Sequence, residues 1–360
     1  MENIMITDTT DIGQIKQAWQ QVQEQHPGMR IREAARKLGL SEGQLLATQV
    51  GQEAKRLLPN WSALLKRLPE LGRVMSLTRN DACVLEHKGA FEKVSVFGEG
   101  DHHMAVVLGP IETRVFLKSW HAGFAVHTTK GDRDLISLQI FDHEGTAVTK
   151  IFLQSESDRA AYDKLVEDFT DPVQDAVLTT EAYDPVSYTA NVDTDAFLTD
   201  WAQLKDTHDF FPMLRKHGVH RYHAVELAEG RFSHRIATSS IEAMLEIASR
   251  EKLPIMVFAG NRGNLQIHQD TVRTIRMLER GHNGAEKWLN VLDPHFNMHL
   301  RIDLVTDVWV VVKPTTDGDV TALECYDANH EMVVQFFGLR KPGQNELTEW
   351  RSLVDDLPKL

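Results

Sequence analysis

The sequence predicts an α+β protein built as a tandem duplication, in which each half is a helical cap followed by a mostly antiparallel β-sheet. Segments with helical periodicity come first, segments with strand-like alternation follow, and this order occurs twice. The strand segments of the two halves also align. VMSLTRNDACVLEH, from Val74, matches IMVFAGNRGNLQIH, from Ile255, and FDHEGTAVTKIF, from Phe141, matches YDANHEMVVQFF, from Tyr326. The shift rises from 181 to 185 positions, so four residues were gained between these blocks.

Length and composition limit the class of protein. The 360 residues fit one large domain or two of medium size, with the apolar content (42%) and charged content (25%) of a soluble globular protein. No apolar run reaches the ~20 residues that span a bilayer, so membrane insertion is not expected. The net charge of −13 disfavours nucleic acid as a partner. There is no visible export signal, and Cys83 and Cys325 form no disulfide framework or metal-binding spacing, so a cytoplasmic location is expected.

In the first half, helices are expected at 12–25, 31–38, 42–49, 61–68 and 156–169, and strands at 74–78, 82–87, 92–97, 104–109, 112–117, 122–128, 135–141 and 147–153. Gly39 ends the second helix, and Ser41 with Gln44 resembles a capping box for the third. AARKLGLSEGQLL, within these two helices, has the form of a helix-turn-helix, which would imply DNA binding. Short helices joined by a glycine are also common in plain bundles, and the acidic net charge favours that structural interpretation.

An acidic segment separates the halves. Residues 165–204 contain nine acidic residues and no Lys or Arg. This composition indicates a solvated linker at about 170–198, between an N-terminal repeat, 1–175, and a C-terminal repeat, 195–360. In the C-terminal repeat, helices are expected at 195–205, 208–217, 221–228 and 241–252, with strands from Ile255 onward.

The segment Trp201–His223, WAQLKDTHDFFPMLRKHGVHRYH, is the richest in candidate ligand residues. Thr207 or Asp206 can cap a helix here, which places His208 in its first turn. Pro212 has no N–H, so the carbonyl of His208 cannot make its usual helical bond. The backbone at His208 is therefore expected to be distorted.

The surroundings of His208 allow two interpretations. Phe210 and Phe211 provide apolar walls, and Arg221 is available downstream to meet an anion, which is the combination that a haem site needs. Alternatively, His208 simply caps a helix, and these residues alone favour this second interpretation.

Other motifs define no reaction. The sequence lacks GxxxxGK[ST], GxGxxG after a strand, GxSxG and HExxH. His217, His220 and His223 suggest a zinc site, because His220 and His223 share one helix face, but no cysteine or well-spaced carboxylate completes it. Exposed or packing histidines are the interpretation that fits these residues better.

The segments DTHDFFPMLRKHGVHR, GNRGNLQI, WLNVLDPHFNMHLR and VKPTTDG, in a duplicated layout, together resemble the HemS/ChuS family of bacterial haemin-degrading and haem-trafficking factors. The resemblance covers nearly the whole chain. It implies two halves built on large twisted antiparallel sheets, with haem b held between helices of the C-terminal half and the sheets. It also implies a cytoplasmic protein that takes haem delivered by an inner-membrane importer.

The resemblance also implies roles for individual residues. The family's axial histidine corresponds to His208, and its distal arginine corresponds to Arg114 in TRVFLKSW. The family's contacts to the haem propionates correspond to Arg221, Lys313 and Arg340. Neutral imidazole is a common axial ligand of haem iron, and cationic side chains suit carboxylates. Because Arg114 comes from the other repeat, one haem would be held between both halves.

The sequence departs from the family pattern at three positions. A tyrosine that offers a hydroxyl to a propionate is Phe337 here. A second haem-binding histidine of some members is replaced by Leu85, with His87 two residues further along, which argues against a second haem site. Pro212 is unusual within the helix that carries the axial histidine.

The leading functional hypothesis is a haem-degrading monooxygenase of the haem oxygenase type, which releases iron after haem import. No flavin or nicotinamide site is visible, so an external reductase or reductant would supply electrons. A carrier that hands haem to a separate haem oxygenase would use the same residues and is the alternative. A haem-responsive DNA-binding regulator is the third hypothesis.

Overall fold

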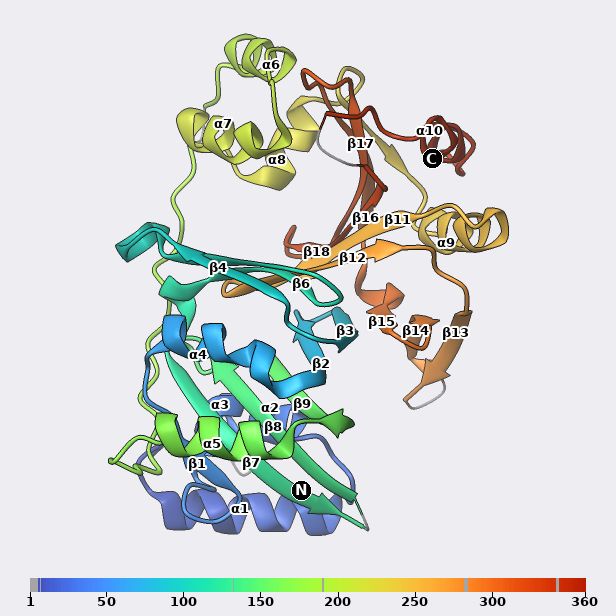
Figure 1. Cartoon of the computed structure of the whole chain (residues 1–360). Helices are drawn as coiled ribbons and strands as arrows, with labels where there is room; N and C mark the ends of the chain where they lie inside the picture. Colours follow the sequence, from blue (N-terminus) through green and yellow to red (C-terminus); the bar gives the residue numbers. More distant parts are fainter. Residues whose placement is uncertain (1–5, 7, 132, 190, 282–283, 341–342) are drawn as a thin grey trace. The chain divides into compact units, whose positions relative to one another are not determined.

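The computed structural model describes residues 6, 8–131, 133–189, 191–281, 284–340 and 343–360 (Figure 1). Its strands form two nine-stranded antiparallel sheets accompanied by helices, which confirms the predicted α+β class. The chain divides into two compact units. Unit 1 comprises Met1–Arg79, His87–Asp184 and Asn261–Leu265, and unit 2 comprises Asn80–Glu86, Pro185–Gly260 and Gln266–Leu360.

The helices of unit 1 form a cap and a layer on the sheet. Their bounds are α1 (Ile12–Gln25), α2 (Ile31–Leu38), α3 (Glu42–Ala47), α4 (Trp61–Arg67), the 3₁₀ turn η1 (Leu68–Leu71) and α5 (Arg159–Phe169). Gly39 ends α2 in the left-handed conformation, at φ 74°, and Ser41 and Gln44 form the predicted capping box of α3. The last helix begins three residues later than predicted, because the side chain of Asp158 caps it by accepting from the N–H of Ala161.

The strands of unit 1 form two antiparallel groups. One group has the order β1-β7-β8-β9-β2, and the other has the order β6-β5-β4. Their bounds are β1 (Ala54–Arg56), β2 (Gly72–Arg79), β4 (Lys93–Phe97), β5 (Met104–Leu108), β6 (Glu112–Phe116), β7 (Ala122–Lys130), β8 (Arg133–Phe141) and β9 (Ala147–Ser157), with β3 (Cys83–Gly89) running from unit 2 into unit 1. Two 3₁₀ turns, η2 (Gly100–His102) and η3 (Leu117–Ser119), flank β5 and β6.

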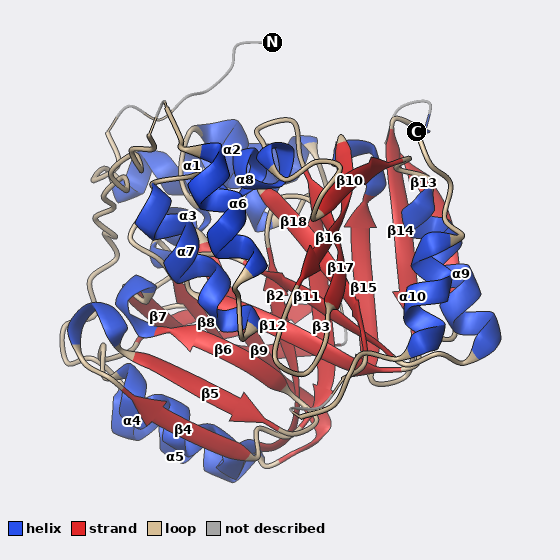
Figure 2. Cartoon of the chain, turned by 90° about the horizontal axis from the view of Figure 1, so that it is seen from above, coloured by secondary structure: helices blue, strands red, loops and turns tan. Residues whose placement is uncertain are grey.

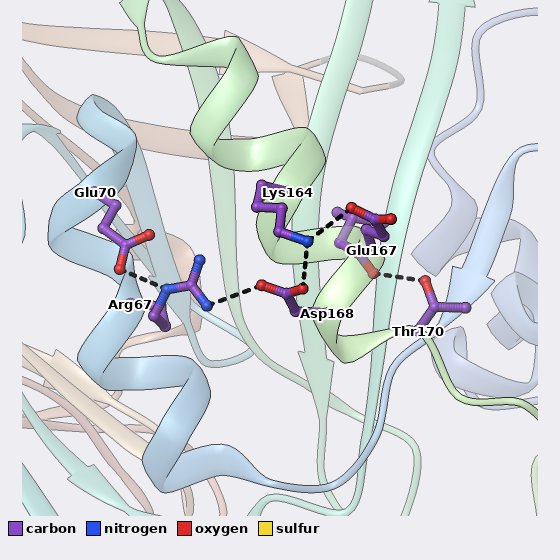
Figure 3. A network of polar contacts seen from close by, with 7 residues as sticks. Arg67, Glu70, Lys164, Glu167, Asp168 and Thr170 are labelled. Atoms are coloured by element: carbon purple, nitrogen blue, oxygen red, sulfur yellow. Dashed lines mark hydrogen bonds and ion pairs between the residues drawn. The ribbon is translucent and has the colours of Figure 1, made fainter.

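The main core of unit 1 lies between α4, α5 and one face of these strands. Leu64 and Leu165 from the helices pack with Val107 and Ile140 from the strands, and each is at most 1% exposed. On the surface, an ion-pair network joins η1 and the two helices through Arg67, Glu70, Lys164, Glu167 and Asp168 (Figure 3). Because these pairs are largely solvated, burial of the apolar residues contributes most of the stability.

Unit 2, like unit 1, combines helices with antiparallel strands. Its helices are α6 (Thr194–Ala202), the 3₁₀ turn η4 (Thr207–Asp209), α7 (Phe210–His217), α8 (Arg221–Leu227), α9 (Ser240–Glu251) and α10 (Thr348–Asp355). Figure 1 shows α6, α7 and α8 grouped beside the strand labelled β17, and Figure 2 shows α9 next to β13. α10 packs against α9 and β18. The two helical layers therefore cover different parts of the unit 2 strands.

The strands of unit 2 also form two antiparallel groups, with the orders β10-β16-β17-β18-β11 and β15-β14-β13. Their bounds are β10 (Ser233–Ile236), β11 (Ile255–Gly260), β13 (Ile275–Arg280), β14 (Glu286–Leu292), β15 (Phe296–Arg301), β16 (Asp307–Lys313), β17 (Val320–Tyr326) and β18 (Met332–Gly338). β12 (Asn264–Asp270) runs from unit 1 into unit 2, and the 3₁₀ turn η6 (Ile302–Leu304) follows β15. Leu323 and Phe336 face the main core, where α9 and α10 pack.

Each unit contains a short turn from the other half of the sequence, and an asparagine anchors each turn. In unit 2, Asn80 donates to the carbonyls of Gly260 (3.2 Å) and Val333 (2.7 Å) and accepts from the N–H groups of Ala82 and Cys83. In unit 1, the asparagine 181 positions later makes the same four contacts at the positions shifted by 181 and 185 residues. These are Asn261 to Arg79 (2.9 Å), Val148 (2.8 Å), Gly263 and Asn264. The duplication deduced from the apolar pattern is therefore present in individual hydrogen bonds.

Part of the acidic segment packs against unit 1. Leu178 is 2% exposed and lies among Leu46, Phe124 and Phe141. The guanidinium of Arg56 donates to the carbonyls of Asp175 and Val177, and the amide of Gln44 donates to the hydroxyl of Thr180. Around Leu178 the segment is thus packed rather than solvated, and the chain passes into unit 2 at Asp184–Pro185.

Candidate functional site

The helical layer of unit 2 supports most of the predicted site residues. Trp201 and Phe210 of the helices pack on Trp309 and Tyr326 of β16 and β17, and each of the four side chains is at most 1% exposed. The indole N–H of Trp201 also donates to the carbonyl of Val312 at 2.9 Å. These contacts fix the position of α7, which follows His208 in the chain.

His208 lies in η4 and is held by Asp206. The Asp206 carboxylate accepts from the backbone N–H of His208 at 2.8 Å and lies 2.6 Å from the ring Nδ1. The imidazole is 92% exposed, and its Nε2 makes no hydrogen bond to any of the described residues. A carboxylate on one ring nitrogen orients the ring and makes the other nitrogen more basic, as in many metal-binding histidines. His208 is therefore suited to bind a metal through Nε2.

The structure explains the proline after His208. α7 begins at Phe210, so Pro212 is its third residue, where an N–H would have no acceptor inside the helix. The predicted irregularity at His208 takes the form of the 3₁₀ turn. Hydrogen bonds from His208, chiefly that of its backbone N–H, lower the pKa of Asp206, and the positive charge of half-buried Arg340 adds to this effect. Arg340 thus lies close enough to Asp206 to act on it electrostatically.

Arg221 and Lys313 meet at a buried carboxylate. Arg221 is the first residue of α8, and its guanidinium donates to Glu324 through Nε at 3.0 Å and through Nη2 at 2.5 Å. The ammonium of Lys313, at the end of β16, donates to the same carboxylate at 2.9 Å. Glu324 itself is 0% exposed on β17. The structure thus brings together two of the three predicted propionate contacts.

The charges of this cluster depend on one another. Burial by itself would raise the pKa of Glu324, but Arg221 and Lys313 hold it far below the usual range. Burial lowers the pKa of Lys313 to about 8, with a further lowering by Arg221 and an opposing effect of Glu324. Burial opposes the charge of Arg221 as well, but Glu324 raises its pKa. At neutral pH the three groups carry a net charge of +1.

The two cations also contact the helix that follows His208. The ammonium of Lys313 lies 4.4 Å from the ring centroid of Phe210, and the guanidinium of Arg221 lies 5.2 Å from the rings of both Phe210 and Phe211. Phe211 is 56% exposed. An exposed imidazole, an exposed aromatic ring, a buried ammonium and a half-buried guanidinium therefore occur on one small part of unit 2.

Phe337 occupies an apolar part of the same strands. It is 8% exposed and belongs to a cluster with Met256, Val320 and Ala322, and its ring centroid lies 5.0 Å from that of Phe258. A phenylalanine here has no hydroxyl to donate. Phe337 can therefore provide an apolar wall but not the polar contact made by the family's tyrosine.

Arg114 lies in unit 1, on the middle of β6. Its guanidinium donates to the Glu112 carboxylate at 2.9 Å, and the side chain is 29% exposed. Cross-strand pairing places Phe97, Met104 and Phe116 in one row on these strands, and the two phenylalanines are 46% and 38% exposed. The cation thus lies on strands with an exposed apolar row. Its predicted position across a haem from His208 stays a prediction.

The structure also places the other positions considered as histidine ligands of haem or zinc. Leu85 is 0% exposed within the core of unit 2, and His87 is 4% exposed. The ring of His217 bonds to Asp200 at 2.7 Å. Over the described ranges, no group of three or more His, Cys, Asp or Glu side chains is arranged to hold a metal ion.

Arg221, Lys313 and the residues bonded to them form a cation cluster, and three of its residues were not predicted from the sequence. Glu324, Tyr326 and Gln335 surround the predicted cations, since the hydroxyl of Tyr326 (2.6 Å) and the amide of Gln335 (3.0 Å) both donate to the Glu324 carboxylate. The signal was a single charged residue within VTALECY, an otherwise uncharged strand whose seven residues are all buried. A buried charge needs a partner, so such a glutamate points to nearby cations.

A family model for the haemin-degrading HemS.ChuX domain matches residues 39–169 and 218–357, one segment in each repeat. The chain belongs to this family. A curated relative, the hemin transport protein HmuS of Yersinia pestis, is 32% identical over 347 residues, covering 94% of this chain and 95% of the relative. No helix among the described residues is long and apolar enough to cross a membrane.

Solved structures of relatives agree with this family assignment. The holo form of PhuS, described as a heme-binding protein from Pseudomonas aeruginosa, has a TM-score of 0.92 and 41% identity, covering 97% of this chain and 100% of that chain. ChuS, described as an E. coli heme oxygenase, has a TM-score of 0.84 and 28% identity, covering 95% and 99%. Family and fold are thus supported by sequence and by structure.

Proposed function

We propose that this protein binds haem b, with Nε2 of His208 as axial ligand of the iron. The observation that carries the proposal is the geometry at His208, where a carboxylate holds Nδ1 and the ring is otherwise exposed. Arg221 and Lys313, with Arg340 near the same turn, would meet the propionates, and Phe337 would form part of the apolar wall. An apolar surface beside paired cations fits a flat macrocycle with two carboxylates.

The proposed activity is oxidative degradation of the bound haem with release of iron. When bound, haem supplies redox-active iron and is itself the molecule that is oxidised. Arg114 would act as a catalytic residue, because its guanidinium donors can orient oxygen-derived groups and water. Electrons would come from an external reductase or reductant, in the cytoplasm, after haem import.

The names of the relatives support haem chemistry. One relative is described as a heme-binding protein, a second as a heme oxygenase and a third as a hemin transport protein. The transport description favours a second candidate function, a carrier that receives haem from an inner-membrane importer and passes it to a separate haem oxygenase. The same ligand and cation cluster would serve such a carrier.

One assay separates the two candidates. Purified protein is loaded with haemin and given a reductant in the presence of catalase, which removes free peroxide that bleaches haem without an enzyme. Loss of the Soret band with stoichiometric release of iron supports degradation. A stable Soret band rejects degradation under these conditions and favours the carrier.

The regulator hypothesis loses its main sequence signal. α3, which would be the recognition helix, has six residues, and five of them are buried: Glu42, Gly43, Leu45, Leu46 and Ala47. A helix that reads a DNA groove must expose one face. α3 is therefore unsuited to that role.

A further inference from the structure

Glu324 lies at the centre of the cation cluster and accepts hydrogen bonds from both cations. Its Oε1 accepts from Arg221, Lys313 and Gln335, and its Oε2 accepts from Arg221 and Tyr326, at distances of 2.5–3.0 Å. A carboxylate has about four lone-pair sites, so this one is saturated by hydrogen bonds. Because Glu324 is 0% exposed and lies within β17, it stays in place as a fixed internal counter-ion.

The carboxylate uses only part of the donor capacity of the two cations. Its bonds to Arg221 use Nε and Nη2, so Nη1 of the guanidinium is not spent on Glu324, and Lys313 gives it one of three N–H donors. Phe210 flanks both cations, and partly exposed Phe211 flanks Arg221. Glu324 therefore orders the two side chains, of which that of Arg221 is 14% exposed and that of Lys313 is 5% exposed, and it leaves some of their donors unused.

This arrangement, with the anion on a strand and a cation on a helix, is found in unit 2 but is reversed in unit 1. In unit 1 a buried carboxylate lies on helix α3 instead, that of Glu42, and it bonds to Lys150 of β9 at 2.5 Å and to Arg79 of β2. The positions that match Glu324 and Gln335, by the shift of 185, are Gln139 and Lys150. Helix α3 carries the anion in unit 1, whereas helix α8 carries a cation in unit 2. The two repeats therefore do not share one inherited ion cluster.

We propose that Glu324 is a positioning residue for the porphyrin carboxylates: it fixes the Arg221 fork and offsets the buried charge of Lys313, so that both cations meet the ligand. This inference rests on the proposed function. Without the carboxylate, two adjacent cations would repel each other inside a protein interior, and Lys313 would release its proton more readily. The cluster as built has a net charge of +1 and attracts anionic carboxylates.

A pH dependence follows from the groups around Lys313, namely Arg221 on α8, Glu324 and Tyr326 on β17, Gln335 on β18 and Phe210 on α7. Burial, together with Arg221, lowers the pKa of Lys313 to about 8 against the effect of Glu324. Below this value Lys313 is charged and binds the ligand carboxylate. As the pH rises above it, free protein loses the proton, and affinity is expected to fall by about tenfold per pH unit.

The test measures binding of metal-free protoporphyrin IX, by quenching of its fluorescence, from pH 6 to pH 10. Wild-type affinity should fall above about pH 8, and in Glu324→Gln the fall should begin at least about one pH unit lower. Glu324→Asp, which keeps the charge, should restore much of the wild-type profile. Protoporphyrin IX dimethyl ester, which has no ionised carboxylates, is the control ligand and should show no such fall with either protein.

Superimposable profiles of wild type and Glu324→Gln would overturn the proposal. If Glu324→Gln does not fold, Lys313→Arg decides, because arginine stays charged throughout this range and should abolish the fall; a fall that persists overturns the proposal. Failure of the proposed function would give a different result. The spectrum of bound haemin would then be the same in wild type and His208→Ala, because His208 would not bind the iron.

Discussion

His208 and Asp206 determine the proposed iron site at the scale of single residues. Their contact is local, because the carboxylate that caps η4 is also the one that holds Nδ1. The sequence presented helix capping and metal binding as alternatives for His208, but in the structure the cap is Asp206. The same carboxylate orients the imidazole that we propose as the metal ligand.

We expect His208→Ala to change the ferric spectrum of the haem-loaded protein and to weaken haem retention by about tenfold or more, because the iron loses its protein ligand. Absorption spectra and haem transfer to apomyoglobin measure both effects. His223→Ala is the matched control, since His223 is also an exposed histidine, 48% exposed and paired with Glu226. An unchanged spectrum in His208→Ala would show that the axial assignment is wrong.

Arg114→Ala should leave haem affinity largely intact and slow haem turnover by about tenfold or more, because a donor near the reacting groups is lost. Single-turnover decay of the Soret band, with catalase present, gives the rate. Lys93→Ala removes an exposed cation from β4, which lies beyond β5 in the same sheet, and serves as the control. A normal rate in Arg114→Ala would remove this residue from the mechanism.

At the scale of elements, the acidic segment shows how a short apolar side chain can fix an otherwise polar stretch. Leu178 is buried by α3, β7 and β8 through Leu46, Phe124 and Phe141. Val173, five positions earlier in the same segment, is 66% exposed. One leucine therefore determines where the segment contacts unit 1.

Leu178→Ala should reduce the free energy of unfolding of unit 1 by about 2–4 kcal/mol, because it leaves a cavity among buried rings. Urea unfolding followed by tryptophan fluorescence measures the change. Val173→Ala, at an exposed position of the same segment, should have an effect within about 0.5 kcal/mol. Equal stabilities of the two variants would mean that the segment does not pack as described.

At the scale of the whole molecule, the duplication includes an exchange of turns. Residues Asn80–Glu86 belong to unit 2 and Asn261–Leu265 to unit 1. Each unit therefore needs a segment from the other half of the sequence to complete its hydrogen bonds.

Asn80→Ala and Asn261→Ala should each reduce stability by about 1–3 kcal/mol, since each leaves backbone carbonyl and N–H groups without their partner. The two effects should be similar because the contacts match residue for residue. Thermal and urea unfolding measure them. A loss in only one variant would show that the two turns are not equivalent in energy.

The sequence by itself determined the fold class, the duplication and the family. Helical and strand periods depend on neighbouring residues, and Gly39, Ser41 and Asp158 act on backbone groups one to four positions away. Such local rules can be read from the chain. Pro212 shows the same locality, because its place in the first turn of α7 depends only on where that helix begins.

Only the tertiary structure decided which charges meet. Arg221 and Glu324 are separated by 103 positions along the chain, and nothing local to either one predicts their bond. Burial on β17 requires the carboxylate to find cations, and the fold provides Arg221 from a helix and Lys313 from the adjacent strand. The exchanged turns have the same origin. Their partners are chosen by the burial of backbone groups in the folded units, which no sequence period records.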